Sequence, residues 1–314
     1  MKKYVIIASA LLLIGGFACQ KEDASLVKDV VEANETTNNR SLESYYEDNI
    51  EDNTQTFIVD ANAPISITGK EGSVLTIPAN NFLDASGNLV QGNVEIQLIE
   101  IFEKADMLRM DMTTLAADGD MLISAGEFFI NATLPGSDES LRLIDMMTLN
   151  VSNENPNPDM KLWKNTGNGW ELFESDDRAP DGLLEPYDAG YVASIPQFGW
   201  INFDVQGLPM CHVDVIVPTG SDPNFTDVFI SLDGMNAMIH VPDAQYNGVD
   251  TYHADAPENH FVSVVVIQMD PNTGLNTYNI VYSTFVTCPL TTINLTPLLN
   301  GSIGGMDNDI NTLP

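Results

Sequence analysis

Short stretches of alternating apolar and polar residues fill most of the chain from Thr56 onward. In the clearest one, Asn93 to Glu100, the apolar residues Val94, Ile96 and Leu98 take every second position, as in a half-buried β-strand. Similar stretches, separated by Gly, Pro, Asn and Asp, lie at 56–59, 65–67, 73–77, 127–133, 147–151, 160–163, 170–173, 190–195, 200–205, 212–217, 227–232, 237–241, 261–269, 277–285 and 292–295. Residues 103–112 favour a short helical turn instead. The pattern predicts an all-β protein built from antiparallel β-sandwiches.

The strand-like stretches fall into two groups that meet near Gln206. We therefore expect a β-rich module over residues 56–206 and a smaller, immunoglobulin-like β-sandwich over residues 207–299. Residues 300–314 are rich in Gly, Asn and Asp and predict a flexible tail. Residues 19–55 are acidic and rich in Asn, Thr and Ser, so they bury too little apolar surface to fold alone. They predict a disordered tether, with room for one short helix near Ala24 to Ala33.

The first 18 residues predict a lipoprotein signal peptide. A short positive end with Lys2 and Lys3 precedes an apolar run, Tyr4 to Gly16, which is too short to span a bilayer. A small residue then precedes Cys19. The segment resembles the lipobox signals, although Gly16 stands where a Leu is usual. This resemblance implies lipidation of Cys19, which would anchor the chain stably once two or more acyl chains are attached. The alternative is an ordinary secretory signal with an unpaired Cys19.

Two further resemblances concern location and fold. Gln20-Lys21-Glu22-Asp23 is similar to the charged export signal of Bacteroidota surface lipoproteins, which implies an outer membrane protein that faces the cell exterior. The stretch around Ile77-Pro78-Ala79-Asn80, with Phe198 to Asn202 further on, resembles a β-rich module of such lipoproteins and, more distantly, ZU5-type domains. Where that module has Cys-Asp-Arg, this chain has Phe203-Asp204-Val205. Neither family implies an enzymatic activity.

The charge excludes one class of partner. The 314 residues carry a net charge of −33, and removal of residues 1–18 takes away two lysines and no acid, which gives −35. Nucleic acids need Lys and Arg partners for their phosphates, so a nucleic-acid partner is not expected. No Lys or Arg follows Arg178. The acids of the second half either bind Ca²⁺ through carboxylate oxygens or form a solvated surface, and we favour the surface.

The cysteine count predicts one disulfide. Lipidation of Cys19 leaves only Cys211 and Cys288, an even pair in an exported chain. Two buried free thiols are the alternative. A disulfide between Cys211 and Cys288 would link the first strand of the second sandwich to the segment before its last strand.

Motifs of the common enzyme classes are absent from the sequence, which contains no Gly-x-Ser-x-Gly, His-Glu-x-x-His, phosphate loop or dinucleotide fingerprint. We therefore expect no catalytic residues, no cofactor and no metal ligands. The region from His253 to His260, with Asp255 and Glu258 between, contains zinc-type donors, but its spacing matches no recurrent ligand set. Polar loop residues are the favoured interpretation.

Three other features have a structural and a functional interpretation. Asp270 to Asn276 superficially resembles a Ca²⁺ loop, yet a hairpin turn explains it better, and the same holds for Asp118 to Asp120. The three tryptophans, Trp163, Trp170 and Trp200, form either a sugar-stacking platform or core packing. We favour packing, with Trp163 facing Trp170 across a hairpin.

Taken together, the sequence predicts a non-enzymatic protein that is anchored in the outer membrane through Cys19. Its expected role is that of a structural, adhesive or protein-binding module, with the membrane and an envelope protein or a glycan as partners. A glycan-binding accessory protein of a polysaccharide-uptake system is the alternative. A surface hydrolase would need two carboxylates at catalytic separation in a pocket.

Overall fold

The computed structural model describes residues 41–314 except 175, 178, 180–181, 220, 271–275 and 296–302. The described residues belong to one compact unit, Arg40–Pro314. The predicted signal peptide, Cys19 and the predicted tether up to residue 40 lie outside them. Within the described part of the chain, every helix is too short or too polar to cross a bilayer.

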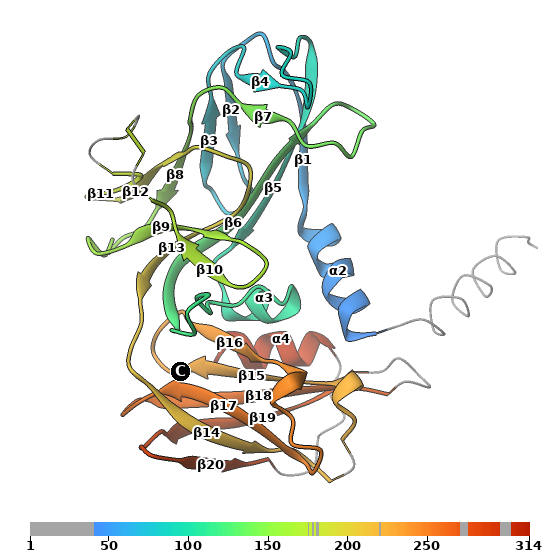
Figure 1. Ribbon diagram of the computed structural model, residues 1–314, viewed down its shortest axis with the longest axis vertical. Helices are drawn as coiled ribbons and strands as arrows, with labels where there is room; N and C mark the ends of the chain where they lie inside the picture. Colours follow the sequence, from blue (N-terminus) through green and yellow to red (C-terminus); the bar gives the residue numbers. More distant parts are fainter. Residues whose placement is uncertain are drawn as a thin grey trace, which may run out of the picture. The chain divides into compact units, whose positions relative to one another are not determined.

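Two antiparallel sheets form the first sandwich, with strand orders β1-β5-β6-β13-β9-β10 and β11-β12-β8-β3-β2 (Figure 1). The larger sheet contains β1 (Gln55–Asp60), β5 (Asn93–Ile101), β6 (Leu122–Thr133), β9 (Lys161–Asn165), β10 (Trp170–Leu172) and β13 (Gly199–Gln206). The smaller sheet contains β2 (Ile65–Thr68), β3 (Val74–Ile77), β8 (Met147–Ser152), β11 (Leu184–Tyr187) and β12 (Gly190–Ile195). A separate pair joins β4 (Phe82–Leu83) to β7 (Arg142–Leu143).

The alternation in β5 explains how this sandwich is filled. Val94, Ile96 and Leu98 are fully buried on one face, as predicted, and belong to the core between the two sheets. Toward the end of the strand Ile99 and Ile101 are also fully buried, but in a different cluster on the other face. The larger sheet is therefore covered on both faces at this end.

The second sandwich has strand orders β17-β14-β20 and β16-β15-β18-β19. Its strands are β14 (Met210–Ile216), β15 (Thr226–Leu232), β16 (Met238–Val241), β17 (Thr251–Pro257), β18 (Phe261–Met269), β19 (Asn276–Phe285) and β20 (Thr291–Asn294). Two short 3₁₀ helices, η1 (Pro223–Phe225) and η2 (Asp243–Gln245), lie in its loops. The all-β sandwich fold is thus confirmed. The first strand pairs with the fourth strand and, in parallel, with the seventh, whereas constant immunoglobulin domains order their sheets ABED and CFG.

A third apolar cluster joins the larger sheet of the first sandwich to the outer face of β15 and β18. Its members come from the helices α2 (Leu42–Asn53), α3 (Lys104–Arg109) and α4 (Ile303–Asn311) as well as from both sheets. Figure 1 shows α3 and α4 between the two sets of strands. The helical turn predicted at 103–112 is therefore confirmed as α3.

The helices α2 and α4 correct two predictions about the ends of the chain. Residues predicted as tether form α2, which begins with a capping box at Ser41 and buries Leu42 and Tyr46 one turn apart. Residues predicted as a flexible tail form α4, which buries Met306 and Ile310 at the same spacing. In both cases an i, i+4 apolar pair contacts the third cluster, so tertiary packing outweighs a polar or glycine-rich composition.

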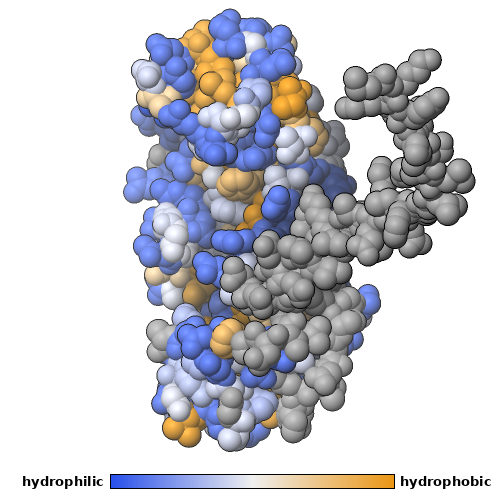
Figure 2. Space-filling view, turned by 90° about the vertical axis from the view of Figure 1, so that its right-hand side faces the viewer, coloured by the Kyte–Doolittle hydropathy of each residue, from blue (hydrophilic) through white to orange (hydrophobic). Residues whose placement is uncertain are grey.

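Polar side chains predominate on the face shown in Figure 2, where apolar residues appear only in small groups. This distribution fits the strongly acidic composition of the chain.

Candidate metal centre

Strands β14 and β17 bring two His-x-Asp sequences together on one surface. His212 and Asp214 lie on the same side of β14, because the residue between them, Val213, is fully buried on the other side. His253 and Asp255 have the same relationship on β17. The antiparallel register sets His212 opposite Asp255 and Asp214 opposite His253. These four residues, here called the His–Asp quartet, form a square on the outer face of the sheet.

The polar atoms of the quartet lie close together. Asp214 Oδ1 is 2.6 Å from His253 Nδ1 and 3.3 Å from His212 Nε2, and Asp255 Oδ1 is 3.6 Å from His212 Nδ1. The two imidazole rings stack with their centroids 5.7 Å apart and their planes 24° apart. A divalent ion shared by the two rings would bind one nitrogen of each.

One donor pair of the quartet has the spacing that a zinc-type ion requires. Zn²⁺ binds imidazole nitrogen and carboxylate oxygen at about 2.0–2.2 Å, so neighbouring donors of a tetrahedral site lie about 3.3–3.5 Å apart. The separation of His212 Nε2 from Asp214 Oδ1 agrees with this value. Asp214 Oδ1 and His253 Nδ1, 2.6 Å apart, are at hydrogen-bond distance, so His253 would bind the ion through Nε2 or Asp214 through its other oxygen. Donor atoms of His212, Asp214 and His253 all lie within 4.8 Å of one another, and no other trio of His, Cys, Asp or Glu in the described part of the chain does so.

The surroundings leave this centre open to solvent. His212 and Asp255 are exposed, whereas Asp214 and His253 are half-buried. A pocket of about 260 Å³ lies alongside, lined by His212, His253, Asp255 and apolar side chains that include Met210 and Ile239. An ion can therefore enter without rearrangement of the core, and a ligand could reach it from the pocket side.

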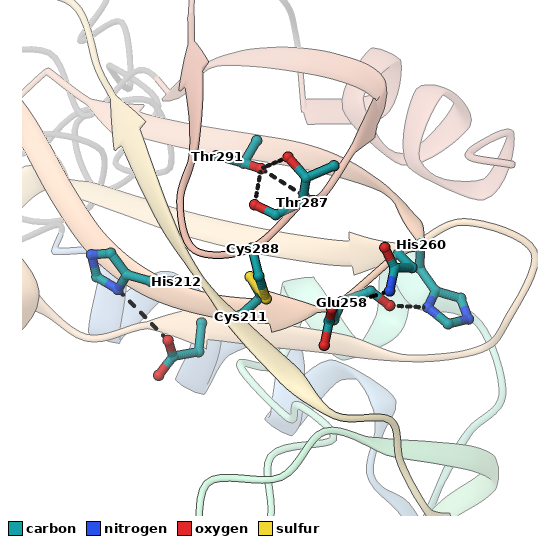
Figure 3. Close-up of a disulfide and its surroundings, with 9 residues drawn as sticks. Cys211, His212, Glu258, His260, Thr287, Cys288 and Thr291 are labelled. Carbon is teal, nitrogen blue, oxygen red and sulfur yellow. Dashed lines mark hydrogen bonds and ion pairs between the residues drawn. A yellow bond between two sulfur atoms is a disulfide. The ribbon is translucent and has the colours of Figure 1, made fainter.

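The disulfide fixes the strand that carries half of the quartet. Cys211 and Cys288 are bonded, with Cα atoms 5.6 Å apart, so the predicted bridge is confirmed. Cys211 is buried and His212 points to the opposite side of β14, as Figure 3 shows. Because β14 also pairs with β17 and β20, His212 and Asp214 sit on a backbone held on both sides. Such support limits the motion of metal ligands.

The region from His253 to His260 does not act as one group. His253 and Asp255 belong to β17, which corrects the prediction that they lie in a loop. Glu258 and His260 do lie in a turn, as predicted, and His260 Nδ1 contacts the Glu258 carbonyl oxygen at 2.7 Å. Figure 3 shows His212 and His260 on opposite sides of the disulfide. Local spacing therefore missed the quartet, whereas the repeated His-x-Asp sequence on two paired strands is the signal that marks it.

The fourth histidine, His240, is placed differently. Its Nδ1 lies 2.9 Å from Asp111 Oδ1 and its Nε2 lies 3.4 Å from Asp227 Oδ1, so the two acids contact opposite edges of the ring. Burial lowers the pKa of His240, but hydrogen bonds and charges from Asp111 and Asp227 outweigh burial and raise it to about 10. The Tyr46 hydroxyl also donates to Asp227. His240 is thus the cation of an internal ion pair, in a domain without Lys or Arg.

Other residues singled out in the sequence have structural surroundings. Trp163 and Trp170 are buried in the third cluster and Trp200 is half-buried, so the three do not form an exposed platform. Trp163 pairs with Leu172 rather than with Trp170, which is its diagonal neighbour on the same face. Asp118 to Asp120 form a turn, with Gly119 at a φ of 95°. Residues 271–275 of the turn predicted at Asp270 to Asn276 lie outside the described residues.

Comparisons with known proteins do not assign a family. No protein-family model matches the sequence, and no curated protein matches it. Among solved structures, a γ-cyclodextrin glucanotransferase from the alkalophilic Bacillus clarkii aligns with the chain at 8% sequence identity and a TM-score of 0.20. That alignment covers 77% of this chain and 41% of the other, so the chain spans less than half the length of that protein.

Proposed function

We propose that this chain is a non-enzymatic binding protein, anchored by lipid at Cys19 on the outer surface of a cell, and that the His–Asp quartet binds a divalent transition-metal ion of the Zn²⁺ class. The geometry of the quartet carries the metal assignment. Imidazole and carboxylate donors suit borderline ions, whereas Ca²⁺ prefers oxygen alone.

A binding role is favoured by the ligand position that the quartet leaves free. His212, Asp214 and His253 supply three donors within 4.8 Å of one another, whereas Asp255 contacts the other ring nitrogen of His212. A fourth position of a tetrahedral site therefore stays open to a donor from outside the chain. Two donors, His212 and Asp255, are exposed, so an ion held here could also bridge to donors of a partner protein. This arrangement supports the adhesive or protein-binding role expected from the sequence.

The proposed location rests on the start of the chain and on the disulfide. The signal peptide and Cys19 predict a lipid anchor, and the bridge between Cys211 and Cys288 fits an oxidising compartment outside the cytoplasm. Replacement of Cys19 by Ser should release the protein from the membrane fraction. In intact cells, added protease should digest the anchored wild-type protein if it faces outward. A Cys19→Ser protein that stays membrane-bound would contradict the anchor.

The glycan-binding alternative depended on exposed tryptophans. Because Trp163 and Trp170 are buried, the tryptophans offer no exposed platform for a sugar ring.

Titration calorimetry with Zn²⁺ tests the metal assignment. The fragment from Gln20 to Pro314 contains the whole compact unit and is suitable for this purpose. We expect one Zn²⁺ to bind, and His253→Ala to weaken binding by more than about 100-fold, because even outer-shell partners contribute 10–100-fold. His260→Ala is the matched control in the same domain and should bind as the wild type does. Equal affinity of the His253→Ala variant, or a wild type that does not bind, would contradict the proposal.

A further inference from the structure

Four polar side chains meet on one buried face of the larger sheet in the first sandwich. Glu127 of β6 lies opposite Asn202 of β13, and Ser124 lies opposite Asp204, with a bulge at Ala125 and Gly126 of β6 between the two pairs. Glu127, Asn202 and Asp204 are completely buried, and Ser124 is 6% exposed. The side chain of Phe203 packs in the core between the sheets, so its two neighbours face the other way. These four residues are called the buried polar patch.

The two carboxylates of the patch are poorly compensated in the described part of the chain. None of their four oxygens has a hydrogen bond of standard geometry to a described residue. Burial raises the pKa of both groups; the charge of Asp204 raises that of Glu127 further, whereas the nearby Ser124 hydroxyl lowers that of Asp204. Two buried carboxylates without a cation are strongly unfavourable, so a proton or a metal ion must neutralise them.

Asn202 provides a second and independent indication. Its Oδ1 accepts a hydrogen bond of 2.7 Å from Ser124 Oγ, whereas its buried Nδ2 has no partner among the described residues. Rotation of the amide by 180° would let Nδ2 donate to Ser124 Oγ and would place Oδ1 where Nδ2 now lies. Because Glu127 is directly opposite Asn202 in the register, that oxygen would then lie on the same buried face as the carboxylates.

We propose that the buried polar patch binds a hard cation of the Ca²⁺ class. The donors are the oxygen atoms of three side chains: the carboxylates of Glu127 and Asp204 and the amide oxygen of Asn202, which Ser124 holds in place. Ca²⁺ takes six to eight oxygen ligands at about 2.3–2.6 Å, with carboxylates binding through one or both oxygens. This site goes beyond the proposed function, since it shares no residue with the His–Asp quartet and takes a different kind of ion.

The patch lies where the second sandwich contacts the first. Ser124 N donates to the Asn236 carbonyl at 2.9 Å, and Asn236 Nδ2 donates to the Ser124 carbonyl at 3.3 Å. The Trp163 indole donates to the Asp204 carbonyl at 3.0 Å. A pocket of about 510 Å³ is lined by Ser124, Asn236 and residues near the C-terminus, and Ser124 is the member of the patch that borders it. A bound cation would therefore stabilise the contact between the two sandwiches.

Thermal unfolding in EDTA and in Ca²⁺ tests this site. For the chain from Gln20 to Pro314, Ca²⁺ at a hundredfold excess over Kd should raise the Tm by about 5–10 °C. Glu127→Gln should abolish the rise, whereas the exposed Glu185→Gln in the same sandwich should keep it. If Glu127→Gln fails to fold, the near-isosteric Asp204→Asn takes its place. A wild type that Ca²⁺ does not stabilise, with a Glu127→Gln variant that is more stable, would show a buried proton instead and overturn the proposal.

Terbium luminescence gives a second readout on the unaltered protein. Tb³⁺ replaces Ca²⁺ in oxygen sites. The Trp163 indole donates a hydrogen bond to the backbone carbonyl of Asp204, so it is close enough to transfer excitation to a Tb³⁺ ion in the patch. We expect Tb³⁺ emission on excitation of tryptophan, displaced by Ca²⁺ and reduced in Trp163→Phe. Equal emission or equal Ca²⁺ stabilisation in wild type and Glu127→Gln would place the ions on the acidic surface and overturn the proposal. His253→Ala should leave both readouts unchanged, so failure here is distinguishable from failure of the zinc assignment.

Discussion

The Tyr46 hydroxyl donates a hydrogen bond to the carboxylate of Asp227, 181 residues further along the chain. Asp227 in turn contacts His240, and His240 contacts Asp111 in the segment after α3. One partly buried polar network thus connects α2, the segment after α3 and the second sandwich. It explains why residues whose composition predicts a tether form an ordered helix from Leu42 onward.

Tyr46→Phe should destabilise the protein by about 1.5–3 kcal/mol, because it removes a hydrogen bond to a buried charged group. Urea denaturation measures this change. Tyr187→Phe is the control, since Tyr187 is 42% exposed and lies in the first sandwich. A Tyr46→Phe variant as stable as the control variant would show that the network does not hold α2.

His240→Gln should cost about 3–5 kcal/mol at pH 7, because it leaves the partly buried acids Asp111 and Asp227 without their cation. The pKa of His240 is about 10 in the folded protein and about 6.5 when unperturbed. The folded state therefore retains a proton that the unfolded state loses, and this stabilisation is complete below pH 6.5 and declines as the pH rises toward 10. The difference in stability between wild type and variant should shrink steadily from pH 7 to pH 9. A difference that is constant or grows with pH would contradict the ion pair.

Cys288→Ser should lower the free energy of unfolding by about 4 kcal/mol, since the bridge closes a loop between residues 77 apart. Reduction of the wild-type protein with dithiothreitol should lower its Tm to about that of the Cys288→Ser variant. The same treatment should leave the Tm of the variant unchanged. A reductant that affects both proteins equally would argue that the bridge does not form.

Glu100→Gln tests a buried carboxylate that does have partners. Glu100 accepts hydrogen bonds from the backbone N–H groups of Glu71 and Ser73, both at 3.0 Å, and from Gln55. The charged acceptor fixes the turn between β2 and β3, so its replacement by a neutral amide should cost about 1–3 kcal/mol. Gly69→Ala should be at least as harmful, because its Cβ would lie 2.2 Å from the Glu100 carboxylate. Unchanged thermal stability in both variants would contradict this role of Glu100.

The strands that the sequence predicts correctly are those in which apolar residues alternate or are β-branched, such as β5 and β15. Strand β17 is missed, because His253, Asp255 and Pro257 interrupt that pattern and the strand is recognised only through its pairing with β14. The helix α4 is also missed, because Gly304 and Gly305 lower its helix propensity and only its packing against the third cluster explains it.

The two candidate ion sites depend on register, which a single sequence does not display. His212 meets His253 only because β14 and β17 align in one antiparallel register, and a shift by one residue would turn every side chain to the other face. The disulfide, by contrast, could be predicted from the sequence, because Cys211 and Cys288 were the only cysteines left to pair.

Anomalous scattering at the zinc edge from crystals soaked in Zn²⁺ tests the central claim most directly. The account predicts a peak about 2.0–2.2 Å from His212 Nε2, an Asp214 carboxylate oxygen and a ring nitrogen of His253, and no peak there in crystals of His253→Ala. Zinc found only elsewhere on the acidic surface, or the same peak in the variant, would contradict the metal centre.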